Sequence, residues 1–178
     1  YPVTTLFQAE KSRDVLLCLD CGRMMGNPIG TGTTLDHAVN AAIMVAYAAV
    51  REGDRVGTIL FSDRCETVLK PASGATALNR VIEQLVDATA QPVFPSYGAL
   101  VEAIRRRQSH RSLVLLLTDL NDPQLAADLA ELMPLLSRRH VVVTASLQDT
   151  ALETRAEDAA ESTEGLYQVL AAQGLVDE

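Results

Sequence analysis

Two aspartates, Asp20 and Asp119, stand at the ends of runs of apolar residues, Asp20 directly after its run and Asp119 after one threonine. The five residues from Val15 to Leu19 are all apolar, and residues 112–119 repeat the pattern as SLVLLLTD. Such runs are typical of strands buried on both faces of a parallel sheet. Because open α/β folds bind ligands at the carboxyl ends of their strands, we expect both aspartates at one rim of a central sheet.

A carboxylate buried at such a rim needs a partner, because an unpaired buried charge is costly. Ser96 is placed to cap a helix and would bring a hydroxyl to the same rim. Carboxylate, hydroxyl and water oxygens suit Mg²⁺, Mn²⁺ or Ca²⁺, so one interpretation is a metal site of Asp20, Ser96 and Asp119. The other is that the carboxylates only fix the loops, with Asp20 accepting the N–H groups of Gly22 and Arg23.

Motifs for other kinds of chemistry are missing from the sequence. The glycine-containing loop at 26–34 has no P-loop lysine, and no G-x-S-x-G nucleophile motif occurs. The three histidines have no metal-ligand spacing to cysteine or to one another. We therefore expect a protein that is not an enzyme and has no certain cofactor. The alternative hypothesis is a metal-dependent hydrolase that uses Asp20 and Asp119.

Composition limits the class of protein and its partners. The 178 residues fit a single domain, and with 48% apolar but only 4% aromatic residues its core must be aliphatic. The net charge of −8 argues against non-specific binding of nucleic acid.

The densest cationic cluster, Arg105 to Arg107 with His110 and Arg111, lies where a helix is expected to end. There it complements the helix dipole, although a protein partner could also use it.

Neither a signal peptide nor a run of the roughly 18 apolar residues needed to cross a bilayer occurs. We expect no membrane contact from this segment, a cytoplasmic location, and a chain that is part of a longer protein.

Patterns along the chain predict an α/β fold. A flexible loop over 26–34 leads to a helix capped by Thr33 or Thr34, whose residues 35–50 are apolar nearly all round and should be deeply packed. Only three residues separate the strands expected at 55–61 and 65–70, so these must form an antiparallel hairpin. The prediction is a three-layer α/β/α domain with a mainly parallel sheet and one antiparallel edge strand.

The order of these parts resembles a von Willebrand factor A-like domain, which is Rossmann-like in fold. RDVLLCLDCGRMM, LDHAVNAAIMVAYAAVREGDRVG and RSLVLLLTDL are similar to a bacterial subgroup, the domain-of-unknown-function family fifty-eight, whose members resemble YeaD2-type proteins. The resemblance covers roughly residues 10–150. It implies one von Willebrand factor A-like domain over residues 1–178.

The resemblance also implies a degenerate form of the metal-ion-dependent adhesion site. The family pattern Asp-x-Ser-x-Ser reads here as Asp20 followed by Gly22 and Met24 in place of both serines. Ser96 falls near the position of the family's threonine, and Asp119 matches its last aspartate. The implied cofactor is a weakly held Mg²⁺.

As a function, the resemblance implies protein binding that assists the assembly or activation of protein complexes, together with a MoxR-type AAA ATPase. The parent proteins are often tethered to the inner membrane by upstream helices. We expect the partner to bind across the loops after Asp20, around Ser96 and after Asp119, with Arg23 and Asp122 as partner-binding residues.

Overall fold

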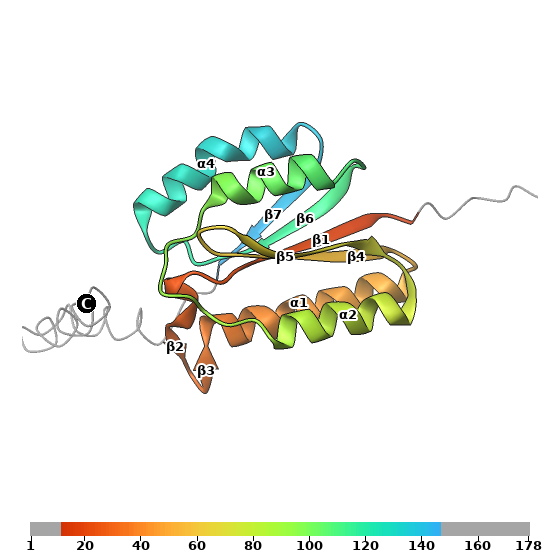
Figure 1. Cartoon of the computed structure of the whole chain (residues 1–178), viewed down its shortest axis with the longest axis horizontal. Helices are drawn as coiled ribbons and strands as arrows, with labels where there is room; N and C mark the ends of the chain where they lie inside the picture. Colours follow the sequence, from red (N-terminus) through yellow and green to blue (C-terminus); the bar gives the residue numbers. More distant parts are fainter. Residues whose placement is uncertain (1–11, 147–178) are drawn as a thin grey trace, which may run out of the picture. The chain divides into compact units, whose positions relative to one another are not determined.

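The computed structural model describes residues 12–146, which form a sheet with two helices on each face (Figure 1). Its elements, in chain order, are β1 (Asp14–Asp20), η1 (Arg23–Gly26), β2 (Pro28–Ile29), β3 (Gly32–Thr33), α1 (Thr34–Arg51), β4 (Arg55–Phe61), β5 (Cys65–Ala72), α2 (Gly74–Val86), α3 (Tyr97–Arg107), β6 (Ser112–Leu117), α4 (Pro123–Ser137) and β7 (Val141–Ala145). The predicted single domain over 1–178 extends beyond these residues at both ends and stays a prediction.

The sheet has the strand order β5-β4-β1-β6-β7. Strand β1 is central and pairs in parallel with β4 and with β6, while β7 extends the parallel part beyond β6. Only β5 is antiparallel, and it lies at the edge beside β4. This arrangement confirms the predicted three-layer α/β/α architecture with a mainly parallel sheet and one antiparallel edge strand.

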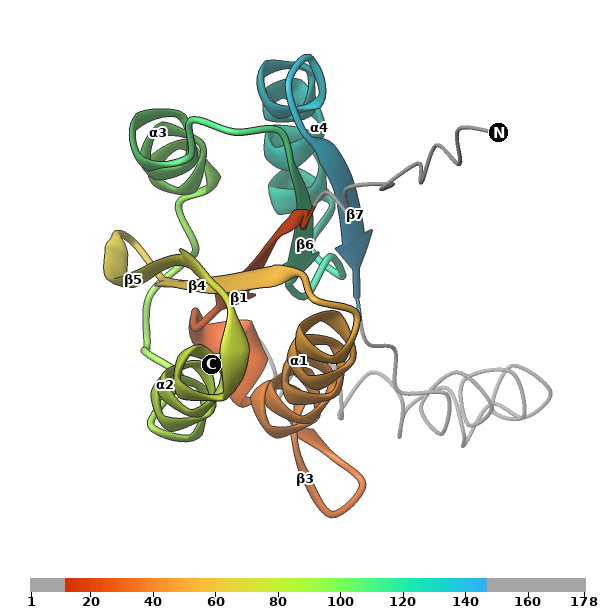
Figure 2. The same cartoon turned by 90° about the vertical axis from the view of Figure 1, so that its right-hand side faces the viewer.

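Strand β1 is apolar on both faces because both faces are covered by helices. Leu17 and Leu19 pack in the core on the side of α1 and α2, whereas Leu16 and Cys18 pack in the core on the side of α3 and α4. All seven residues of β1 are buried. Figure 2 shows the two helix layers on opposite sides of the strands.

The hairpin of β4 and β5 depends on a glycine. A Cβ atom at Gly57 would lie 2.5 Å from the carbonyl oxygen of Leu69, closer than any side chain could approach. The β5 backbone therefore crosses directly above Gly57, where the register between the two strands shifts.

Two expectations about the region before and within α1 were wrong. Residues 26–34 are not simply a flexible loop, because β2 and β3 pair as a short antiparallel hairpin and the N–H of Thr34 bonds to the carbonyl of Asn27 over 2.9 Å. Helix α1 begins with the predicted cap, a capping box between Thr33 and Asp36. It is not buried all round, however, since Met44 is 73% exposed.

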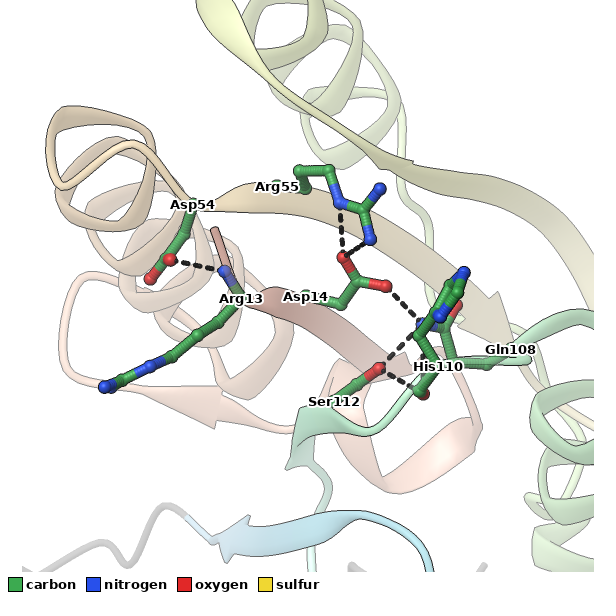
Figure 3. A network of polar contacts seen from close by, with 7 residues as sticks. All are labelled: Arg13, Asp14, Asp54, Arg55, Gln108, His110 and Ser112. Carbon is green, nitrogen blue, oxygen red and sulfur yellow. Dashed lines mark hydrogen bonds and ion pairs between the residues drawn. The ribbon is translucent and has the colours of Figure 1, made fainter. Parts of the chain in front are cut away.

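The amino end of β1 is fastened by a network of polar contacts (Figure 3). The carboxylate of Asp14 accepts hydrogen bonds from Arg55 Nε over 2.6 Å and from Gln108 Nε2 over 2.7 Å. Arg55 Nη2 also lies 2.6 Å from the same carboxylate. Gln108 Nε2 donates in addition to Ser112 Oγ over 2.6 Å. The network joins β1, β4, β6 and the end of α3.

None of the helices that the structure describes is long and apolar enough to cross a membrane.

Candidate functional site

The carboxyl end of β1 buries Asp20, and both of its carboxylate oxygens accept hydrogen bonds. The N–H of Gly22 donates to Oδ1 over 2.6 Å, and the hydroxyl of Thr118 donates to Oδ2 over 2.6 Å. Thr118 directly follows β6, the strand beside β1. The predicted bond from Gly22 is therefore present, but the N–H of Arg23 bonds elsewhere, to the carbonyl of Val93 over 2.8 Å.

A third residue, Tyr97, extends these contacts into helix α3. Its hydroxyl oxygen lies 2.9 Å from Thr118 Oγ1. Because Thr118 gives its only hydroxyl proton to Asp20, the Tyr97 hydroxyl must donate to Thr118. Burial raises the pKa of Tyr97 to about 12, so the phenol keeps its proton at neutral pH. A chain of two hydroxyls thus leads from α3 to the Asp20 carboxylate.

The ionised form of Asp20 is poorly compensated. Burial, the largest cause, raises its pKa to about 6, and the nearby Asp119 carboxylate adds to this, while the hydrogen bonds from Thr118 and Gly22 act in the opposite direction. Burial likewise raises the pKa of Asp119, whose Oδ1 accepts the N–H of Asn121 over 2.8 Å. The structure therefore brings the two predicted aspartates close enough for their charges to repel. Perturbed carboxylates of this kind are candidates for a functional site.

The structure places Ser96 and the two serine-replacing residues in other roles. Ser96 Oγ accepts the N–H of Ala99 over 3.3 Å and caps α3, and in the described part of the chain it has no hydrogen bond to either aspartate. A Cβ atom at Gly22 would lie 2.9 Å from Asp20 Oδ1, so the loop has no room there for the serine of the family pattern. Met24 lies in the η1 turn and is half-buried.

These observations bear on whether a divalent cation fits. A cation would relieve the repulsion between Asp20 and Asp119, and carboxylate oxygens are suitable ligands. Both oxygens of Asp20 already accept internal hydrogen bonds, however, and residues 12–146 contain no cluster of three or more His, Cys, Asp or Glu side chains suited to a metal ion. The site of Asp20, Ser96 and Asp119 remains a prediction with few free ligand atoms.

Around the aspartates lies a surface of four loops, which we call the rim and define as residues 21–23, 62–64, 91–96 and 118–122. Backbone hydrogen bonds join the first three: the N–H of Gln91 bonds to the carbonyl of Cys21 over 2.7 Å, and the N–H of Ser96 bonds to the carbonyl of Ser62 over 2.7 Å. The fourth is joined to the end of β1 by the bond from Thr118 to Asp20. The loops of the rim are connected to one another before any partner binds.

The rim exposes a stacked pair of side chains. The guanidinium carbon of Arg23 lies 4.4 Å from the centre of the Phe94 ring, and Phe94 is 50% exposed. The second predicted partner-binding residue, Asp122, caps α4 by accepting the N–H groups of Gln124 and Leu125. Arg23 thus presents a charge on an aromatic platform, while the carboxylate of Asp122 is engaged by its own helix.

Sequence reasoning missed three residues of this site. Thr118 stands directly before Asp119, and a hydroxyl at the end of an apolar strand was a usable signal. Tyr97 fits the apolar spacing of α3, which concealed its polar role. Phe94 lies in a proline-bracketed loop whose position no pattern along the chain reveals.

Comparison with known proteins identifies the family to which the sequence is similar. Residues 2–157 match the family described as "Protein of unknown function DUF58". No curated protein is similar enough to count as a match.

Among solved structures, the chain is similar to the conserved hypothetical protein BatB from Bacteroides thetaiotaomicron, with a TM-score of 0.58 and 15% identity over 75% of this chain and 65% of that one. Proximal thread matrix protein 1 from the mussel byssus gives a TM-score of 0.52 and 17% identity over 76% of this chain and 35% of that one. The VWA domain of SpRpn10 gives a TM-score of 0.48 and 11% identity over 78% of this chain and 90% of that one. The chain thus spans less than two thirds of the first two proteins. Together with the strand order, the likeness to BatB confirms the predicted von Willebrand factor A-like fold.

Proposed function

Because the chain belongs to the DUF58 family and has a von Willebrand factor A-like fold, we propose that it is a non-catalytic module that binds a protein partner across the rim. The finer part of the proposal follows the family resemblance. The partner is a MoxR-type AAA ATPase, the shared task is the assembly or activation of protein complexes, and upstream helices tether the parent protein to the inner membrane.

The exposed pair of Arg23 and Phe94 carries the proposal. Arginine and aromatic side chains are enriched at protein interfaces and among the residues that contribute most to binding. The pair lies on loops already joined by hydrogen bonds, so little conformational entropy would be lost in ordering these loops when a partner binds.

The geometry of Asp20 supports binding over hydrolysis. A carboxylate that activates water must accept a proton from it within hydrogen-bond reach. Both oxygens of Asp20 instead accept hydrogen bonds from Gly22 and Thr118, and these bonds hold the loop after β1 against the end of β6. The buried carboxylates thus shape the surface that Arg23 and Phe94 present.

The test is a binding measurement between the full chain and the purified MoxR-type ATPase of the same organism. Arg23→Glu reverses the exposed charge of the rim and should weaken binding at least tenfold. Arg13→Glu is the matched control, since Arg13 is exposed at the opposite end of β1. Equal effects of the two variants would reject the rim as the binding surface, and no binding by the unaltered chain would reject the ATPase as partner.

A further inference from the structure

A groove of about 530 Å³ runs between α3 and α4, on the outer side of the helix layer. Its apolar lining includes Val101, Leu132 and Leu135, and Leu135 is 42% exposed. Its other walls are polar, with Arg105 and Arg106 from the last turn of α3. The groove therefore combines an apolar floor with a cationic border.

More arginines lie at this end of the two helices than the two that line the groove. Helices α3 and α4 both start at the carboxyl edge of the sheet, so their C-terminal ends lie at the same edge (Figure 1). Arg138 follows α4, whereas Arg107 lines a different hollow between α3 and β5, and the guanidinium of Arg139 donates to the carbonyl of Ser109. The cationic border of the groove is therefore Arg105 and Arg106. Cations at helix C-termini complement the dipoles, but the dipoles do not account for the apolar floor beside them.

The two lining arginines differ in their partners. Arg106 Nη2 lies 2.5 Å from Glu102 one turn earlier, in an exposed pair that contributes little to stability. Arg105 has no ion pair within residues 12–146. It is therefore available to a carboxylate on a second molecule.

The shape of the groove selects the form of its occupant. Its walls are two helices, which have no free backbone edge to which a strand could be added. Helix α3 has 11 residues, about 16 Å of length, which matches three turns of a bound helix. An amphipathic helix would place apolar side chains at i, i+4 and i+7 on the floor and acidic ones against the arginines.

We propose that the groove between α3 and α4 is a second interaction surface, which binds an acidic amphipathic helix of a partner protein. It is separate from the rim and goes beyond the function proposed above. Charge complementarity carries the choice of partner: in a protein of net charge −8, this groove is bordered by arginines.

Substitutions at Gly98 can test whether the groove binds a helix. It lines the groove, and a Cβ atom placed there would meet no other atom within 4 Å. A large side chain at Gly98 can therefore fill the groove without disturbing the core, and helix propensity improves when glycine is replaced. Gly98→Trp should block the groove, while Gly98→Ala leaves it open.

The probe is a fluorescein-labelled peptide of about four helical turns, with leucines at i, i+4 and i+7 and glutamates between them. Fluorescence anisotropy with the full chain should show saturable binding. Gly98→Trp should weaken it at least tenfold, and so should Arg105→Glu combined with Arg106→Glu. Gly98→Ala and Arg80→Glu, an exposed cation on α2, should leave it within twofold. Circular dichroism would confirm that each variant is folded.

Several outcomes would overturn the proposal. Absence of binding would do so, as would equal binding of a peptide with the same composition in scrambled order, which would show attraction by charge alone. Equal binding of a peptide with lysine in place of glutamate would show that the arginines are irrelevant. If the chain self-associates in sedimentation and Gly98→Trp abolishes this, the occupant is a second copy of the chain.

Discussion

Each end of β1 buries an aspartate, but only one of the two has a cation as its partner. Asp14 is 3% exposed and is held by Arg55 and Gln108. Asp20 is also buried, yet its hydrogen bonds come from an amide and a hydroxyl, and the charge that acts on it is that of another carboxylate, Asp119. One strand thus carries a compensated charge at its amino end and a poorly compensated one at its carboxyl end.

The difference separates structural from functional use of a buried carboxylate. At the amino end, the ion pair and hydrogen bonds join the strands, and every interaction is satisfied inside the fold. At the carboxyl end, the fold tolerates a charge that costs free energy, beside exposed loops with an arginine stacked on an aromatic ring. Strain or cost of this kind tends to gather where a protein binds or reacts.

The largest effect is expected from Arg55→Met, which keeps an unbranched apolar stem but leaves Asp14 without its cation. Breaking a buried ion pair by removing one partner is strongly destabilising, because the other charge stays buried. Arg55 is partly exposed, so we expect a loss of about 2–3 kcal/mol in the free energy of unfolding, measured by urea denaturation at pH 7. The additional change Asp14→Asn should recover part of the loss. A loss well below 1 kcal/mol would mean that the two ends of β1 differ little.

An effect of similar size and opposite sign is expected from Asp20→Asn. The carboxyl of the folded chain has a pKa raised to about 6, against 3.8 for the ordinary value, so it is protonated in both states only below about pH 3 and costs nothing there. As the pH rises through this interval, the folded state must give up a proton that it holds more tightly, and its stability falls.

The asparagine variant avoids this cost, so it should be more stable than the unaltered chain by about 3 kcal/mol at pH 8 and indistinguishable from it at about pH 3. Thermal unfolding at both values would measure the difference. Thr118→Val is the useful contrast, since it removes a hydrogen bond to the carboxylate and should destabilise at pH 8. Destabilisation by Asp20→Asn at pH 8 would show that the ionised carboxylate of Asp20 is well compensated in the folded protein.

The smallest effect is expected from divalent metal. Because both oxygens of Asp20 accept internal hydrogen bonds and Ser96 caps α3, calorimetric titration with Mg²⁺, Mn²⁺ or Ca²⁺ should give binding no tighter than about 1 mM. Asp119→Asn provides the control for any heat that is seen. Tighter, saturable binding that this variant and Asp20→Asn both abolish would make the two carboxylates metal ligands, and Asp20 would then have a cation as its partner, as Asp14 has.

The sequence was sufficient for the parts of the fold that depend on short patterns. Apolar runs ending in Asp20 and Asp119 located two central strands, and the three-residue turn before Cys65 required an antiparallel neighbour. The same patterns could not show that Asp14 meets Gln108, since 94 residues separate them. Nor could they show that Gly22 leaves no space beside Asp20, because that space is closed by Val93 and Pro95 from a distant loop.

The central position of β1 has a consequence for how the protein is made. Of the five strands in this sheet, β1 is synthesised first and needs neighbours on both sides, and the second of these, β6, begins at Ser112. The bond between Asp20 and Thr118 spans 98 residues. A nascent chain that ends before β6 therefore has an apolar strand with one unpaired edge and a rim that lacks residues 118–122. Contacts so distant in sequence form slowly, so the rim is completed late in the synthesis of this sheet.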